Sequence, residues 1–217
     1  ANFSRAFLDV NRNENEIDPS MFEDKLVNEN IITKKVSAGF GLIPKRTLKG
    51  KKIYRTKIKN NELVNRLNEV YYPWHKDLKK LINHVYKKFN FCLLLDFHSM
   101  PSNIEYGSLS NRSEICISNL DEKSCSSEIT LSLADEFKSL GYNVTINYPF
   151  KGGYIVDSYS DKKGLMTLQL EIRRDIYMDE NKLVLKNDFK KIKSDFYSAI
   201  SNFSNLVKDN CFNVAAE

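Results

Sequence analysis

Several features that would place a protein in a specialised class are scarce or absent in this 217-residue sequence. Its four cysteines include no C-x-x-C pair and no dense disulfide framework, which indicates reduced thiols in a cytoplasmic protein. No apolar run approaches the length of a membrane span, and residues 1–20 lack a signal-peptide pattern. We therefore expect a protein without a membrane partner.

Positive charge is also not clustered as a nucleic-acid-binding surface requires. The formal net charge is +5, and the lysines are spread along the chain rather than clustered. Internal repeats and low-complexity segments are missing as well. With 41% hydrophobic and 28% charged residues, the composition is that of an ordinary globular protein. A single domain over residues 1–217, without nucleic acid as a partner, is therefore predicted.

The most informative stretch is FCLLLDFHSMPS, residues 91–102. Its five leading apolar residues are typical of a strand buried on both faces in the middle of a parallel sheet. The strand delivers Asp96 and His98 to its C-terminal end, where open α/β sheets bind ligands. Two residues apart on an extended chain, they point the same way, so the carboxylate can fix the imidazole tautomer while the other nitrogen binds metal. A structural histidine that closes the strand is the competing interpretation.

Two more predicted strands carry polar groups to their ends. Residues 4–12 alternate loosely and finish with Asn11 and Arg12, and residues 166–177 place Glu171 opposite an apolar face. A strand this apolar on one side is expected near the centre of a sheet, where a buried glutamate needs a partner or a function, although a solvent-exposed face is the plain alternative. Imidazole for a metal, carboxylate as base and guanidinium for a substrate carboxylate suit a metal-assisted hydrolase.

The remaining elements predict a three-layer α/β domain, because strands and helices alternate after residue 60. Pro73 should break or bend the first helix; His75 just after it could face the site, and His84 should lie on the surface. Helices are predicted over residues 61–88, 126–140 and 189–207, a strand over 142–148, and loops over 101–123 and 149–154.

Taken together, these stretches resemble the N-formylglutamate amidohydrolase family. The matches follow the family's order and cover most of the chain: FLDVNR (7–12), YYPWHKDL (71–78), LLLDFHSMPS (93–102), NYPFKGGYI (147–155) and LQLEIRRDIYMDE (168–180). The resemblance implies a zinc carboxypeptidase- or phosphorylase/hydrolase-like fold, with a mixed, mostly parallel sheet flanked by helices. It also implies hydrolysis of N-formyl-L-glutamate to formate and glutamate in histidine breakdown.

The resemblance further implies roles for individual residues. His98 matches the second zinc histidine with Asp96 as its outer partner, and one zinc ion per chain is expected. Glu171 matches the catalytic glutamate that activates the metal-bound water, while Asn11 and Arg12 match the pair that grips the substrate carboxylate. Two residues in family-like positions could bind substrate or the developing oxyanion, or be structural: Tyr154 and Arg174.

Two departures from the family pattern affect this reading. The family supplies a first zinc histidine and a glutamate from an N-terminal His-x-x-Glu-type segment, which this sequence lacks. We therefore expect that residues are missing upstream of Ala1 and that the remaining zinc ligands lie there. The 217 residues alone are expected to bind zinc poorly. Many relatives carry an arginine near Leu120, for which Arg112 or Arg174 would have to substitute. Three functions stay open: a zinc deformylase of N-formyl-L-glutamate or a close N-acyl amino acid, a related N-acyl amino acid or peptide hydrolase, and a non-catalytic carboxylate-binding remnant.

Overall fold

The computed structural model describes residues 2–25, 30–103, 113–160 and 164–214. The chain divides into two compact units, Ala1–Val85 and Tyr86–Glu217, called here the first and the second unit and described separately. The prediction of one domain over the whole chain stays a prediction. Within the described ranges, no helix combines the length and apolar character needed to cross a membrane.

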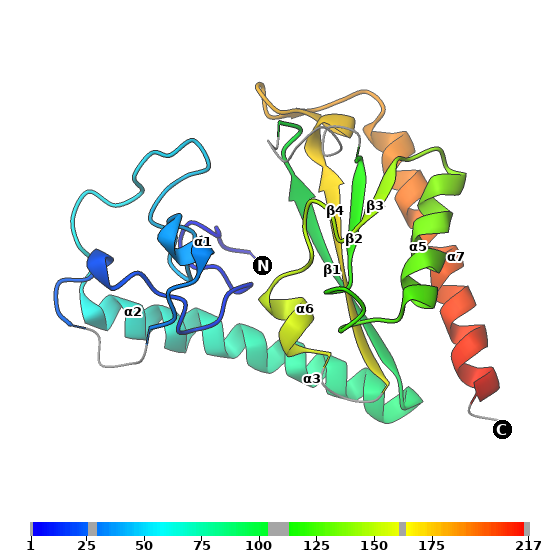
Figure 1. The fold of residues 1–217 in the computed structure, drawn as a ribbon, viewed down its shortest axis with the longest axis horizontal. Coiled ribbons are helices and arrows are strands. Elements are labelled where there is room, and N and C mark those ends of the chain that lie inside the picture. The colour runs from blue at the N-terminus through cyan, green and yellow to red at the C-terminus, as the bar shows by residue number, and fades with distance from the viewer. Residues whose placement is uncertain (1, 26–29, 104–112, 161–163, 215–217) are drawn as a thin grey trace. The chain divides into compact units, whose positions relative to one another are not determined.

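A four-stranded sheet forms the centre of the second unit (Figure 1). Its strands are β1 (Cys92–Met100), β2 (Ile115–Ser118), β3 (Val144–Ile146) and β4 (Leu165–Arg173), in the order β1-β4-β2-β3. β1 runs parallel to β4 and β2 parallel to β3, while β2 and β4 are antiparallel. The predicted mixed, mostly parallel sheet is confirmed.

Helices cover both faces of this sheet. α5 (Ser127–Ser139) and α7 (Phe189–Val214) lie side by side on one face, and the short α6 (Tyr154–Ser158) lies on the other (Figure 1). α5 begins where the Ser126 hydroxyl accepts a hydrogen bond from the amide of Ile129, which caps the N-terminus of the helix. Between β4 and α7 the chain forms the 3-10 helix η3 and a small hairpin: η3 (Arg174–Ile176), β5 (Met178–Asp179) and β6 (Val184–Leu185).

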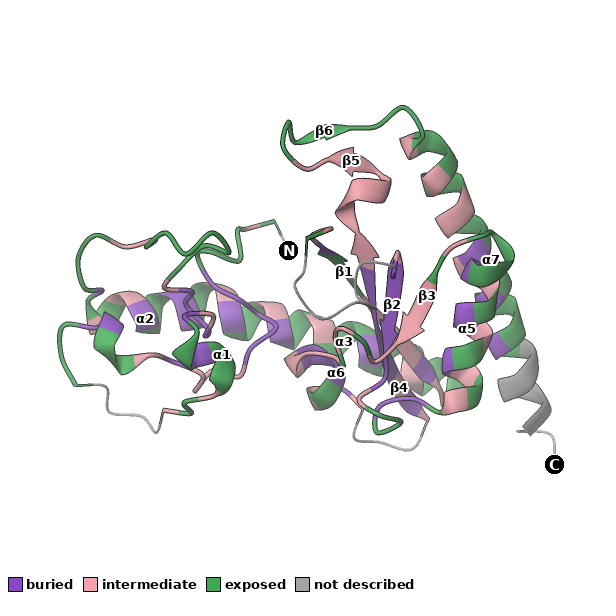
Figure 2. Cartoon of the chain, turned by 45° about the horizontal axis from the view of Figure 1, so that its top comes forward, coloured by how far each residue is buried: buried purple, intermediate pink, exposed green. Residues whose placement is uncertain are grey.

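The apolar core of the second unit lies between the sheet and the α5–α7 pair. Its buried side chains come from both layers: Ile115, Ile117, Leu133, Phe137, Leu168, Leu170, Ala199 and Phe203. Figure 2 shows β2 and the middle of β4 as buried, whereas α5 and α7 alternate between buried and exposed residues. Because burying one such side chain stabilises a fold by about 1.5–3 kcal/mol, this face supplies most of the stability of the unit.

Two predictions for the sheet are wrong. Among the described strands, β1 pairs with β4 alone and is an edge strand, and its Phe97 is 51% exposed. The apolar run misled because Leu93 and Leu95 pack on the core while the residues between them face the other way. The stretch 101–123, predicted as a loop, contains β2, whose four residues are all buried and too few to show a period.

The first unit has little regular structure before its helices (Figure 1). Residues 4–12, predicted as a strand, form turns instead. Among the described residues before residue 60, the only helices are η1 (Pro19–Met21) and α1 (Lys34–Ser37). An unbroken helical run follows: α2 (Asn60–Arg66), the π-helical η2 (Leu67–Tyr71) and α3 (Tyr72–Phe89), whose last turn belongs to the second unit. The predicted irregularity near Pro73 is therefore a π-helical segment inside one continuous run.

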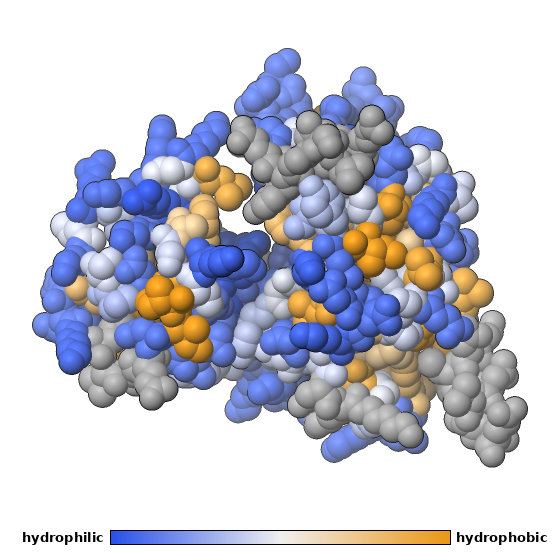
Figure 3. All heavy atoms as spheres, in the orientation of Figure 1, coloured by the Kyte–Doolittle hydropathy of each residue, from blue (hydrophilic) through white to orange (hydrophobic). Residues whose placement is uncertain are grey.

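Hydrophilic side chains dominate the face of each unit that Figure 3 shows, with apolar residues scattered between them. The scattered distribution of apolar residues on this face agrees with a chain in which 28% of the residues are charged.

Candidate functional site

The sheet face opposite α5 and α7 is polar. On β4, Thr167, Gln169 and Glu171 point to it, because Leu168 and Leu170 alternate with them and fill the core. Register partners on neighbouring strands share a face of a sheet. The polar face, as we call it, therefore also carries the partners of Gln169 and Glu171: Asp96 and His98 on β1, Ser118 and Cys116 on β2.

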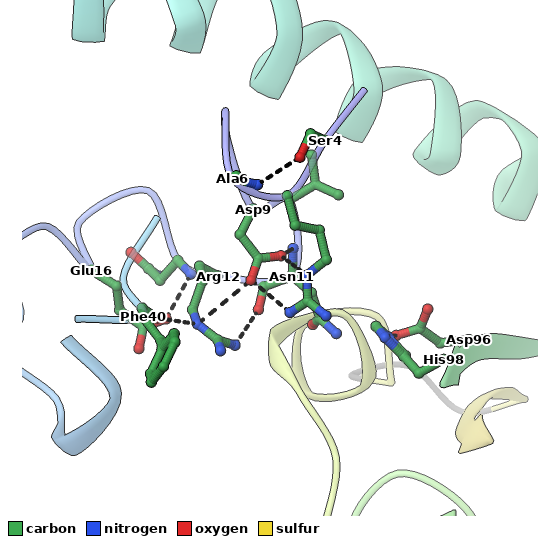
Figure 4. A network of polar contacts seen from close by, with 12 residues as sticks. Ser4, Ala6, Asp9, Asn11, Arg12, Glu16, Phe40, Asp96 and His98 are labelled. Carbon is green, nitrogen blue, oxygen red and sulfur yellow. Dashed lines mark hydrogen bonds and ion pairs between the residues drawn. The ribbon is translucent and has the colours of Figure 1, made fainter. Parts of the chain in front are cut away.

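Asp96 and His98 interact directly, as their spacing predicts. His98 Nε2 donates a hydrogen bond of 2.8 Å to Oδ2 of Asp96, and both side chains are largely buried (Figure 4). A carboxylate oxygen accepts, so Nε2 is the donor of this hydrogen bond. An imidazole with one nitrogen anchored in this way is oriented for metal binding through the other.

Glu171 is buried, at 7% exposure, and it accepts a hydrogen bond of 3.0 Å from Nε2 of Gln169. On its other side lies Cys116, whose pKa is raised by burial and further by the charge of Glu171. A thiol in these surroundings stays protonated and is a poor nucleophile. Cys116 is therefore no candidate to accept a proton from water, and the role of general base stays a prediction for Glu171. The alternating pattern of the strand places Gln169 on the same face as Glu171, whereas sequence reasoning did not identify Cys116 as a neighbour.

The loop that leads to α6 is tied to the end of β2. Ser118 Oγ donates a hydrogen bond of 2.7 Å to the carbonyl of Phe150. The amide of Asn119 donates to Oδ1 of Asn147 at 3.0 Å, and Asn147 Nδ2 donates back to Oδ1 of Asn119 at 2.7 Å. These contacts fix the stretch that ends at Tyr154, the half-buried first residue of α6.

Leu120, near which the family resemblance leads us to expect an arginine, has a packing role. Its φ is 55°, and Asp121 and Glu122 follow with φ of 54° and 72°, so the chain makes a left-handed turn here. A Cβ placed on Gly152, whose φ is 128°, would lie 3.0 Å from Leu120 Cδ2. The glycine thus lets the backbone approach Leu120 closely, and the leucine closes this corner of the loop.

Two arginines were candidates to replace a missing oxyanion partner. Arg112 lies outside the described residues. Arg174 opens η3 directly after β4, and its Nε is buried without a hydrogen-bond partner among the residues described. Its neighbour Arg173 is already paired, with Nε 2.6 Å from Oδ1 of Asp175. Arg174 is thus the arginine in this part of the chain with a buried donor available to a ligand.

Asn11 and Arg12 belong to the first unit. Arg12 Nε donates to the carbonyl of Phe40 at 2.9 Å, and its Nη1 donates to that of Asn11 at 2.8 Å (Figure 4). Burial lowers the pKa of Arg12, and the nearby carboxylate of Asp9 opposes that shift. Asp9 in turn is held by Arg5 through two hydrogen bonds, of 3.1 and 2.7 Å. The Arg12 guanidinium is therefore a buried cation in a fixed orientation.

The two other histidines are also in the first unit. His75 donates from Nε2 to the carbonyl of Val10 at 3.1 Å, and burial lowers its pKa to about 4. It is therefore neutral near pH 7 and supports the segment that carries Asn11 and Arg12. His84 is exposed, as predicted.

A complete zinc centre is not found among the described residues. No three histidine, cysteine, aspartate or glutamate side chains within these ranges come together as an ion's ligands. The oriented His98 fits one ligand position and the rest of the set does not fit, because tetrahedral catalytic zinc takes three protein ligands. The expectation of zinc stays a prediction.

Comparison with known proteins gives consistent matches. Residues 1–178 match the family model described as N-formylglutamate amidohydrolase. The N-formylglutamate deformylases of Pseudomonas putida and Pseudomonas aeruginosa are 25% and 27% identical to this chain over 184 residues. The alignments cover 83% of this chain, which spans 63% and 64% of the length of those relatives.

Solved structures agree with the sequence matches. The crystal structure of N-formylglutamate amidohydrolase from Ralstonia eutropha JMP134 superposes with a TM-score of 0.89 and 26% identity, covering 96% of this chain and 77% of that one. The gene product Atu2144 from Agrobacterium tumefaciens gives a TM-score of 0.60 at 16% identity, over 99% of this chain and 70% of that one. The second likeness concerns the fold alone.

Proposed function

This chain belongs to the N-formylglutamate amidohydrolase family, and we propose that the protein hydrolyses N-formyl-L-glutamate, or a close N-acyl amino acid, to formate and the free amino acid. Both curated relatives described above are named N-formylglutamate deformylase. The observation that carries the proposal is the pairing of β1 with β4, which makes His98 the register partner of Glu171 on the polar face. Free thiols at the three described buried cysteines support a cytoplasmic setting: Cys92, Cys116 and Cys125.

In this proposal Glu171 is the general base. It takes one proton from a water molecule as the water oxygen bonds to the acyl carbon, and it passes that proton to the amide nitrogen as the C–N bond breaks. For the formyl substrate, the second water proton leaves the new carboxyl group and completes the ammonium group of glutamate. One water is consumed, and formate and glutamate are the products.

Zinc is part of the proposal, and His98 is the residue of this chain that would hold it. Asp96 keeps the proton of His98 on Nε2, so that Nδ1 can serve as the ligand. When bound, zinc would supply the acidity that brings the pKa of a coordinated water to about 7. A complete site needs ligands beyond the described residues.

Cationic residues would recognise the carboxylate of the substrate. Arg12 is the leading candidate, with Asn11 beside it, because backbone carbonyls fix its guanidinium and a fixed fork matches a carboxylate well. Arg174 is proposed for a substrate carboxylate or the developing oxyanion, since its buried Nε lacks a partner among the described residues. Tyr154 is proposed as a further substrate contact at the start of α6.

The test is formate release from N-formyl-L-glutamate by the full-length protein. Glu171→Gln should lower kcat by about 10²–10⁴-fold, the range expected for loss of a general base. Glu128→Gln is the matched control, because Glu128 is an exposed glutamate on α5 and should leave turnover unchanged. Normal turnover by the Glu171 variant would contradict the mechanism.

Metal analysis of the same protein tests the zinc proposal. About one zinc per chain is expected from a single catalytic centre. His98→Ala should abolish zinc binding, whereas His84→Ala, on the exposed surface of α3, should retain it. Equal zinc content in both variants would remove His98 from the site.

A binding function without catalysis is the second candidate. It is favoured by the incomplete ligand set among the described residues. It is also favoured by the apolar Leu120, packed at Gly152, near the position where the family resemblance leads us to expect an arginine. It predicts that full-length protein supplied with zinc binds N-formyl-L-glutamate, loses that binding in Arg12→Ala, and releases no formate. A panel of other N-acyl amino acids and small peptides, with one hydrolysed better than the formyl compound, would instead indicate a related hydrolase.

A further inference from the structure

Gln169 occupies an unusual place for an uncharged polar side chain. It lies in the middle of β4 at 4% exposure, between Asp96 on β1 and Ser118 on β2 in the sheet register. Its Nε2 donates to Oε1 of Glu171 at 3.0 Å, and its own Oε1 is buried without a partner among the described residues. The amide is thus attached to the site through Glu171.

Stability alone does not explain this amide. Burying a polar group costs free energy unless its hydrogen bonds are made, and here one of the two ends is left unsatisfied within the described chain. On the opposite face of the same strand, Leu168 and Leu170 show that β4 accommodates apolar side chains of similar size. We therefore attribute the presence of the Gln169 amide to its one hydrogen bond, the one that it donates to Glu171.

The direction of that hydrogen bond follows from charge. If the two ends of the Gln169 amide were exchanged, its oxygen would face Oε1 of the Glu171 carboxylate at 3.0 Å, with no proton between the two acceptors. The ionised carboxylate thus sets the orientation of the amide, and the amide in turn restrains rotation of the carboxylate about its last torsion, which is otherwise broad.

We propose that Gln169 is a positioning residue for Glu171. By holding Oε1 it fixes the plane of the Glu171 carboxylate, so every turnover starts from the same carboxylate geometry. This inference rests on the proposed role of Glu171 as base. Gln169 does not itself touch the reacting atoms.

The variant Gln169→Met tests the proposal in the full-length protein, because methionine keeps the length of the side chain and removes the donor. A misplaced base lowers turnover by about 10- to 100-fold, and we expect that loss in kcat with KM changed less than about twofold. Thr167→Val is the matched control. Thr167 lies two residues away on the same face, and its Oγ1 donates to the carbonyl of Val156 at 2.7 Å, away from Glu171. Its loss should lower the melting temperature but leave kcat unchanged.

A double variant separates positioning from general loosening of the site. In the Glu171→Gln background, Gln169→Met should cause no further loss of kcat, because its effect acts through the carboxylate. A further tenfold loss there, an unchanged kcat in Gln169→Met alone, or an equal loss in Thr167→Val would each overturn the proposal. Gln169→Leu, which also removes the donor, takes the place of the methionine variant if that one fails to fold.

Failure of the proposed function gives a different result. If the wild type releases no formate, the hydrolase assignment fails, and crystal structures of the wild type and Gln169→Met then decide the positioning role. A single Glu171 conformer in the wild type that moves or splits in the variant supports it. The same conformer in both overturns it.

Discussion

The two units of this chain are stabilised by different kinds of contact. In the second unit, apolar side chains of the sheet, α5 and α7 form one buried cluster. In the first unit, three buried side chains of the helical run donate to backbone carbonyls of the turns at residues 7–12: Arg66 to Phe7 at 2.7 Å, Tyr71 to Arg12 at 2.8 Å and His75 to Val10 at 3.1 Å.

The difference follows from local structure. A strand satisfies its carbonyls within the sheet, whereas the turns of residues 7–12, which are buried from Leu8 onward, have to find donors elsewhere, because an unpaired buried carbonyl is costly. The helical run supplies those donors from 59 to 65 residues away. The second unit should therefore be sensitive to changes in side-chain volume, and the first to loss or protonation of single polar groups.

The largest effect is expected from a cavity in the second unit. Phe203 of α7 is 1% exposed in the core, and Phe203→Ala should destabilise this unit by about 3–5 kcal/mol, through lost burial and an unfilled cavity. Hydrogen exchange read segment by segment should show the loss of protection in β2 and β4. Leu206→Ala, on the same helix at 44% exposure, is the control and should cost much less. Equal losses in the two variants would mean that the cluster is not the main support of the unit.

The same difference decided what the sequence could predict. In the second unit the boundaries of α5 and the course of β4 follow from local signals, a serine cap and a long alternating pattern, and the family resemblance predicted the sheet type correctly. In the first unit, residues 4–12 alternate like a strand but form turns, because the contacts that hold them come from a distant helix. Periodicity within a window does not detect such contacts.

In the candidate site, too, contacts within one strand were predictable and contacts between distant segments were not. The Asp96–His98 hydrogen bond was predictable because it depends on a spacing of two residues along one strand. Gln169 has the same spacing of two from Glu171 on β4. Cys116 was not predictable, because it comes from β2, a four-residue strand without a readable pattern, and reaches Glu171 only through antiparallel pairing with β4. The role of Gln169 needed the geometry of the polar face.

The next largest effect is expected from acid, which should lower the stability of the first unit through His75. Burial lowers the pKa of His75 from 6.5 to about 4, so between these pH values the unfolded chain binds a proton that the folded first unit does not. The free energy of unfolding of the first unit therefore has its full value above about pH 6.5, falls as the pH drops, and levels off below about pH 4. The loss due to His75 is at most about 3 kcal/mol. Hydrogen exchange of residues 7–12 between pH 7 and 4.5 measures it.

Two variants on the helical run isolate this effect. His75→Gln keeps a donor for the carbonyl of Val10 but does not titrate, and it should flatten the acid dependence of the first unit. His84→Gln removes an exposed histidine and should leave that dependence as it is. The same acid response in the His75 variant and the wild type would assign the loss to other groups.

The smallest effect is expected from removing one tyrosine hydroxyl in each unit. Tyr142 donates to Oδ2 of Asp195 at 2.7 Å, and Tyr142→Phe should cost the second unit no more than about 1 kcal/mol, because the ring still packs on Phe137 and Phe196. Asp195 also keeps its partner Lys191, at 2.6 Å.

Tyr71→Phe removes the same group from the first unit, and there the buried carbonyl of Arg12 loses this donor. The cost should be about 1–3 kcal/mol, because a buried acceptor left unsatisfied bears its full desolvation penalty. Tyr197→Phe, at 76% exposure on α7, sets the baseline for losing an exposed hydroxyl. Chemical denaturation followed by exchange within each unit gives the three values. If Tyr142→Phe cost as much as Tyr71→Phe, polar contacts would support both units alike. The larger loss in Tyr71→Phe would instead show that the segment bearing Asn11 and Arg12 keeps its conformation through single hydrogen bonds, which a core of packed side chains does not need.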